Sequence, residues 1–129
     1  MIGYAMLGTR DQARANAFYD QVLGLVGGKR VMQFDNGEII WGNGPGKPML
    51  AVGPTYDGQP ATVGNGSMLA LEAPTRAIVD ALHAAALANG GRCEGPPGVR
   101  GEEGPKAFYA AYFRDPDGHK LCAYRSGPA

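Results

Sequence analysis

The second half of the sequence repeats the first, at a spacing of 64 residues for the leading positions and a longer one near the end of each unit, and this repeat limits the folds open to the chain. The matching pairs are Leu7 with Leu71, Phe18 with Leu82, Leu23 with Leu87, Gly27–Gly28 with Gly90–Gly91 after a one-residue slip, Gly46 with Gly118, and Met49–Leu50 with Leu121–Cys122. An internal duplication of one supersecondary unit is the economical interpretation, and each unit then needs the other to bury its apolar face.

Both halves predict the same order of elements. Apolar positions at three- and four-residue steps predict a helix over 9–25 and a second over 75–88. Short apolar runs between glycine, proline and asparagine turns predict strands, with a glycine-rich loop over 95–105. The expected strands cover 2–8, 29–34, 38–42, 49–53, 67–73, a stretch beginning at 91–95, 106–114 and 119–124.

These elements predict an α+β fold in one domain over 1–129. Two tandem βαβββ modules follow, module one over about 1–53 and module two over about 67–126, with a polar linker over about 54–66. A small sheet with a helix on one face needs a partner on the other. Two such sheets facing each other enclose a concave, partly open barrel-like cleft with the helices outside.

Charge and composition limit the possible partners. Twelve basic and twelve acidic residues cancel, and no run of like charge appears, so we expect no nucleic-acid partner. No apolar stretch approaches the roughly 18 residues of a membrane-spanning helix. The start lacks the pattern of a secretion signal, and two cysteines make no disulfide scaffold, so a cytoplasmic location is expected.

Three phrases, "FYDQVLG", "GNGSMLALEAPTRAIVDALHAAALANGG" and "YAAYFRDPDGHKL", stand in this order across the duplication. Together with the repeat, they resemble the vicinal oxygen chelate superfamily. That superfamily contains glyoxalase I, extradiol dioxygenases, and the fosfomycin- and bleomycin-resistance proteins. The resemblance covers almost the whole chain and implies the fold, but function depends on the residues of the site.

The resemblance also implies where metal ligands would stand. Metal-using members carry His on the first strand of a unit and Glu on its last strand. These positions fall on Tyr4 and Met68, on Cys122, and on or beside Leu50, none of which is His or Glu. A catalytic zinc needs several His or carboxylate ligands, so we expect no metal and no other cofactor.

The two histidines of the chain offer no replacement ligand set. His83 lies on the second predicted helix and is expected to be partly packed or exposed. His119 follows the turn glycine Gly118 and is expected at the surface. A metal site built from these two residues is therefore not expected.

Strand alternation groups the candidate binding residues. Tyr4 shares a face with Met6, and Cys122 shares one with Lys120 and Tyr124. The resemblance implies that these faces line the cleft, and such apolar, polarizable side chains suit a hydrophobic or aromatic small molecule. The predicted ligand-binding set is Tyr4, Met6, Trp41, Leu50, Met68, Tyr109, Lys120, Cys122 and Tyr124. Catalytic residues are not assigned.

Several of these residues have a second interpretation. Trp41 also suits the core or a dimer interface, and Cys122 is either a wall of the pocket or a nucleophile. In the strand over 106–114, alternation separates Tyr109 from Tyr112 without saying which of them faces the helices.

Three functions follow from these alternatives. The favoured one is a metal-free protein that binds a small molecule, as bleomycin-resistance proteins do at a dimer interface. The others are a metal-dependent lyase or dioxygenase of the same superfamily, and a non-catalytic structural or regulatory subunit. Because relatives commonly pair, a homodimer is expected.

Overall fold

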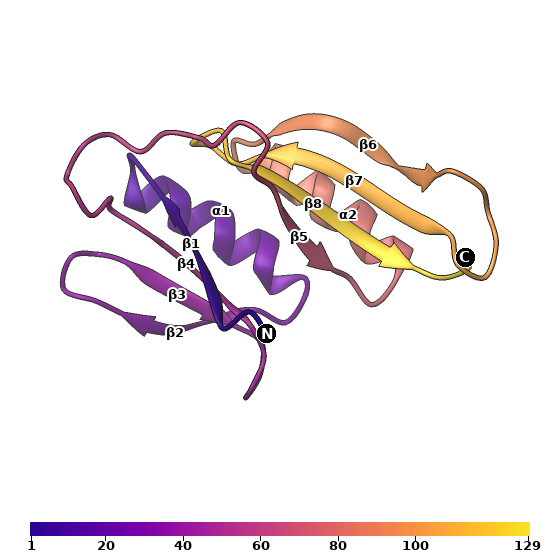
Figure 1. The fold of residues 1–129 in the computed structure, drawn as a ribbon, viewed down its shortest axis with the longest axis horizontal. Helices are drawn as coiled ribbons and strands as arrows, with labels where there is room; N and C mark the ends of the chain where they lie inside the picture. Colours follow the sequence, from indigo (N-terminus) through magenta and orange to yellow (C-terminus); the bar gives the residue numbers. More distant parts are fainter.

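The computed structural model describes all residues, 1–129, and shows the predicted element order in both halves (Figure 1). The first unit consists of β1 (Tyr4–Gly8), α1 (Gln12–Gly24), β2 (Lys29–Gln33), β3 (Ile39–Gly42) and β4 (Met49–Gly53). The second consists of β5 (Leu69–Glu72), α2 (Arg76–Ala88), β6 (Arg92–Arg100), β7 (Phe108–Arg114) and β8 (Lys120–Ser126). Neither helix is long and apolar enough to cross a membrane.

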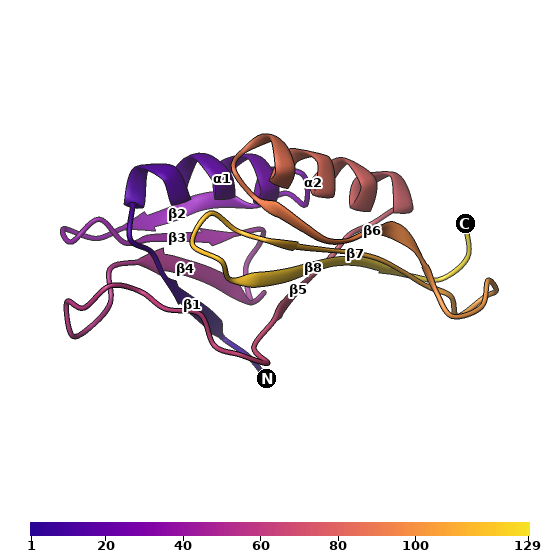
Figure 2. The ribbon, with the colours of Figure 1, turned by 90° about the horizontal axis from the view of Figure 1, so that it is seen from above.

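The strands form two separate four-stranded sheets with the same topology. Their orders are β1-β4-β3-β2 and β5-β8-β7-β6, with a parallel first pair and antiparallel pairs thereafter. Both helices lie on the same side of the two sheets and pack against each other (Figure 2). The α+β fold is confirmed, although the sheets do not close into a barrel. Each sheet therefore has a helix-facing side and an outer face that no helix covers.

The core lies between the helices and the sheets. A cluster of 17 buried residues draws on both units. The predicted apolar face of α1 is confirmed, because Ala15, Phe18 and Val22 are buried. Phe18 joins the units, since its ring centroid lies 6.3 Å from that of Phe113 on β7. Only glycine fits at position 91 beside this contact, because a Cβ there would lie 2.6 Å from the carbonyl oxygen of Arg114.

A polar contact also joins the two units. The turn between β7 and β8 places the Asp117 carboxylate, 3% exposed, at the start of α1. It accepts hydrogen bonds from the Thr9 hydroxyl at 2.5 Å, the Arg10 backbone at 2.9 Å and the Arg14 guanidinium at 3.3 Å. Burial works to raise the pKa of Asp117, but these partners outweigh it and hold the pKa below its usual value. The turn needs a glycine at Gly118, where φ is +97°.

Some element boundaries predicted from the sequence of the second unit are wrong. β6 continues to Arg100 through Pro96 and Pro97, where a loop was expected. An edge strand tolerates proline because one side of its backbone has no partner, and the pairing with β7 is irregular here. The helix predicted over 75–88 begins one residue later, at Arg76, because Thr75 is its N-cap.

Candidate functional site

The strand pairing corrects the alignment of the two units by one residue. Met6 lies opposite Ala51 in the first sheet, and Ala70 lies opposite Cys122 in the second. Met6 and Ala70 are 64 residues apart, so the counterpart of Cys122 is Ala51 and not Leu50. A one-residue shift along a strand changes the face, and Leu50 lies on the helix-facing side.

The outer face of the second sheet carries an aromatic ring between two cations. The Tyr112 ring centroid lies 5.4 Å from the Arg100 guanidinium carbon and 5.6 Å from Lys120 Nζ. Both distances are within cation–π range. A second aromatic pair, Phe108 and Tyr124, stands beside it with ring centroids 5.4 Å apart. We call this surface the Tyr112 face; its residues are Arg100, Phe108, Tyr112, Lys120, Cys122 and Tyr124.

Cys122 forms the base of the Tyr112 face. It is 1% exposed and lies opposite Tyr112 in the β7–β8 pair. Burial raises the pKa of its thiol, and the hydrogen bond with Tyr112 and the charges of Arg100 and Lys120 offset only part of that rise. A buried, neutral thiol is a poor nucleophile. The geometry therefore favours Cys122 as a wall of the site.

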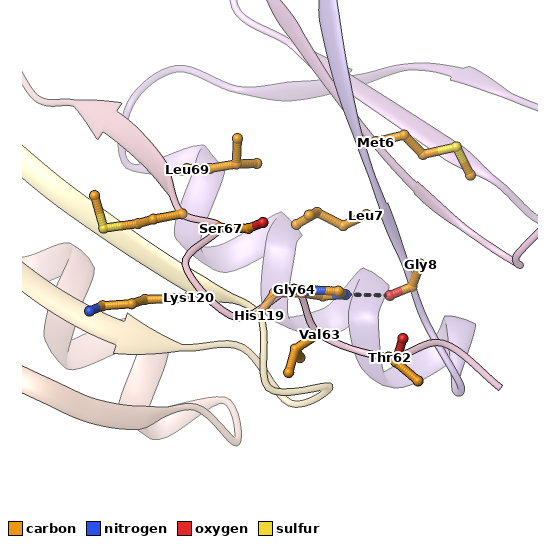
Figure 3. A pocket seen from close by; sticks show the side chains of 11 residues that line it. Met6, Leu7, Gly8, Thr62, Val63, Gly64, Ser67, Leu69, His119 and Lys120 are labelled. Atoms are coloured by element: carbon orange, nitrogen blue, oxygen red, sulfur yellow. Dashed lines mark hydrogen bonds between the residues drawn. The ribbon is translucent and has the colours of Figure 1, made fainter.

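A cavity of about 360 Å³ lies between the two units (Figure 3). Three predicted residues come together in its lining: Met6 from β1, Met68 from the end of the linker, and Lys120 from β8. Lys120 lines the cavity and also belongs to the Tyr112 face, so this residue joins the two. The other lining residues are Leu7, Gly8, Thr62, Val63, Gly64, Ser67, Leu69 and His119.

His119 closes this cavity against the first unit. Its Nε2 lies 2.7 Å from the carbonyl oxygen of Gly8, as the dashed line in Figure 3 shows. A carbonyl oxygen only accepts hydrogen bonds, so Nε2 carries the proton. The expected surface position is thus corrected: His119 is half-buried and holds the two units together. Nothing in the sequence beyond its place after the turn signals this contact.

A second, larger hollow opens between the C-terminal end of α1 and β5. Its volume is about 930 Å³, and 13 of its 22 lining residues are hydrophobic. Trp41, Leu50 and Tyr124 are among them. Trp41 and Leu50 are 2% and 7% exposed, so they form its floor. We call this hollow the α1–β5 groove.

Comparison with known proteins places the chain in a family. The profile of the Glyoxalase/Bleomycin resistance protein/Dioxygenase superfamily matches residues 1–123. The chain belongs to this superfamily. A solved glyoxalase/bleomycin resistance protein from Albidiferax ferrireducens T118 is 38% identical and superposes with a TM-score of 0.86, covering 97% of this chain and 98% of that chain. No curated protein matches the chain significantly.

More distant structures of the superfamily share the fold. A glyoxalase-related enzyme from Fulvimarina pelagi is 21% identical, with a TM-score of 0.73 and coverage of 97% of this chain and 87% of that one. Lactoylglutathione lyase from Agrobacterium tumefaciens is 22% identical, with a TM-score of 0.64 and coverage of 97% and 92%. At these identities the likeness concerns the fold alone.

The residues at the positions that the family resemblance assigns to metal ligands do not suit a divalent ion. With the strand register corrected, these positions hold Tyr4, Ala51, Met68 and Cys122. They offer neither imidazole nor carboxylate, the ligands that zinc takes at such sites. No group of three or more His, Cys, Asp or Glu side chains in the structure is arranged to hold a metal. The function proposed below therefore uses no metal ion.

Three predicted residues do not lie on an outer face. Trp41 packs against the Tyr19 ring under α1, donates to Asp20 at 3.0 Å, and shares its side of the sheet with Leu50. Tyr109 donates to Asp80 of α2 at 2.6 Å. The expected placement of Tyr109 is thereby corrected, because the alternate residues of β7, Phe108 and Tyr112, face outward.

Tyr4 lies apart from the other candidates. It is 63% exposed on the outer face of the first sheet and lines neither the cavity nor the groove. The structure thus brings Met6, Met68 and Lys120 together, and places Cys122 and Tyr124 next to them on the Tyr112 face.

Proposed function

We propose that this superfamily member binds a hydrophobic or aromatic small molecule with an anionic group on its Tyr112 face, without a metal ion. The observation that carries the proposal is the Tyr112 ring between the Arg100 and Lys120 cations. An aromatic ligand packs beside Tyr112 against the neighbouring rings of Phe108 and Tyr124, and the adjoining cavity accepts an apolar substituent.

The charges of this surface favour an anion. Neither Arg100 nor Lys120 forms an ion pair within the chain. The Arg100 guanidinium binds only the backbone oxygens of Gly98 and Pro96. Two acidic residues share this side of the sheet: Glu72 stands opposite Tyr124 at the far end, and Glu94 is paired with Arg114 and lies within the field of Lys120. A carboxylate placed near Tyr112 therefore meets Arg100, which has no acidic partner, and Lys120, which forms no ion pair. Charge-assisted hydrogen bonds are the strong ones.

Replacing Tyr112 with alanine is expected to weaken ligand binding by about fivefold, because an aromatic contact contributes on the order of 1 kcal/mol. The measurement is calorimetric titration with benzoate, naphthoate and indole acetate, with neutral naphthol as the uncharged counterpart of naphthoate. Naphthoate is expected to bind more tightly than naphthol, and Arg100→Gln is expected to reduce that difference, because Lys120 remains.

The matched control for this titration is Tyr56→Ala. Tyr56 is a fully exposed linker aromatic, and its loss is expected to leave binding unchanged. Absence of any saturable ligand contradicts the proposal and favours a structural or regulatory subunit. Leu25 also lines the α1–β5 groove. Binding that survives Tyr112→Ala but is lost in Leu25→Glu places the ligand in that groove and overturns the assignment to the Tyr112 face.

We also propose that a second copy of the chain covers the outer face of the first sheet. Five apolar side chains are exposed there: Tyr4 by 63%, Met6 by 46%, Val31 by 54%, Met32 by 50% and Met49 by 37%. A contiguous apolar surface of this kind is typical of an interface. β1 is an unpaired edge of this sheet and offers further backbone groups to a second copy.

Sedimentation at micromolar concentration is expected to show a homodimer, and Met6→Glu is expected to shift it to monomer by placing a charge in the interface. Leu87→Glu is the control, because Leu87 is similarly exposed, at 41%, but lies on α2. A wild-type protein that sediments only as monomer contradicts this assembly.

A further inference from the structure

The chain has a second cysteine whose surroundings differ from those of Cys122. Cys93 lies on the edge strand β6, is solvent-exposed and forms no disulfide. The His83 imidazole on α2 is directed at it, with Nε2 3.3 Å from Cys93 Sγ. This pair lies on the helix-facing side of the second sheet, away from the Tyr112 face.

The packing of His83 fixes its ring against the thiol. His83 is only 7% exposed, and its ring meets the Phe113 ring edge-on with centroids 6.5 Å apart. Phe113 is also the residue opposite Cys93 in the β6–β7 pair. One core aromatic therefore positions both members of the pair. A nucleophile within hydrogen-bond reach of an oriented base is the arrangement that activates a thiol.

The charged groups around the pair leave His83 able to accept a proton. Burial lowers the pKa of His83, and the nearby Asp80 carboxylate opposes this only in part, so its environment favours the neutral imidazole, the form that accepts a proton. On β6, Arg92 and Glu94 flank Cys93 and point to the opposite side by strand alternation. Glu94 is moreover paired with Arg114 of β7 at 2.9 Å.

We propose that Cys93 is a thiol-modification site that reacts with low-molecular-weight disulfides, with His83 accepting the thiol proton. In the tautomer with its proton on Nδ1, His83 takes the thiol proton at Nε2 while Sγ attacks one sulfur of the disulfide. The new bond joins Sγ to that sulfur, and the old sulfur–sulfur bond breaks. The departing thiolate takes the proton from His83. One mixed disulfide and one free thiol result, and the disulfide is the only oxidant consumed.

Reaction with dithiodipyridine, a neutral chromogenic disulfide, tests this proposal under non-denaturing conditions. The wild-type protein is expected to release one equivalent of thiopyridone in a fast phase. Cys93→Ser is expected to remove that phase, and Cys122→Ser to leave it intact, because Cys122 is buried. Incubation with oxidised glutathione is expected to add one glutathione per chain, which mass spectrometry locates at Cys93.

The pH dependence of the reaction rate distinguishes proton acceptance by His83 from simple exposure of the Cys93 thiol. His83→Gln is expected to slow the fast phase at pH 7 by about fivefold or more, and to approach the wild-type rate above about pH 9, where an ordinary thiol ionises unaided. Equal rates at pH 7 overturn the role of His83. If His83→Gln does not fold, the wild-type profile decides: a rate that follows an unassisted thiol across the whole pH range overturns the proposal.

Discussion

Replacing Phe18 with alanine is expected to lower the free energy of unfolding by about 3–5 kcal/mol, the usual cost of removing a buried aromatic ring. The Phe18 side chain is completely buried. Its ring meets Tyr19 edge-on with centroids 4.9 Å apart, and it reaches Phe113 of the second unit. The cavity left by alanine therefore lies at the junction of the two units. The backbones of both units there limit how far neighbouring residues can move in to fill it.

Unfolding of the wild-type protein tests whether the two units unfold together. Because their buried residues form one cluster, denaturant unfolding followed by Trp41 fluorescence and by circular dichroism is expected to give one coincident transition. Tyr56→Ala is the control and is expected to change the free energy of unfolding by less than about 0.5 kcal/mol, since Tyr56 is fully exposed. Two separated transitions in the wild-type protein contradict a shared core.

Asp115→Ala is expected to lower the free energy of unfolding by about 3 kcal/mol, because it leaves several buried donors without an acceptor. The Asp115 carboxylate is 4% exposed. It accepts hydrogen bonds from the Tyr19 hydroxyl at 2.6 Å and from the backbone N–H groups of Asp117 and His119 at 3.0 and 2.9 Å. These bonds shape the turn between β7 and β8 and join it to α1.

Chemical denaturation measures this loss, and Asp35→Ala is its matched control. Asp35 lies in the hairpin turn of the first unit, is exposed, and makes no side-chain hydrogen bond. Tyr19→Phe separates one contact from the rest and is expected to cost less than Asp115→Ala. If Asp115→Ala and Asp35→Ala have equal effects, the turn does not hold the units together.

Much of the fold was predictable because each unit carries local signals twice. The apolar period of α1, the glycines after each helix and the turn before β8 all act over a few residues, and the structure confirms them. The end of β6 was not predictable in this way. Prolines within a strand are tolerated only at a sheet edge, and the edge position depends on the order of strands in space.

The candidate site was harder to predict because it depends on which way each strand faces. Alternation separates Tyr109 from Tyr112 but does not say which of them meets α2. A one-residue error in aligning the units moved the counterpart of Cys122 from Ala51 to Leu50, and so to the other side of the sheet. The contact between His83 and Cys93 joins a helix to an edge strand, and no sequence spacing encodes that distance.

The most direct test of metal-free binding is the naphthoate titration, repeated on protein whose metal content has been measured, with and without a chelator. Because the positions that metal-using relatives fill with ligands here hold Tyr4, Ala51, Met68 and Cys122, saturable binding is expected at unchanged affinity when no metal is present. Stoichiometric zinc, nickel, manganese or iron in the purified protein, with binding that is lost on chelation and restored by adding the metal back, contradicts it.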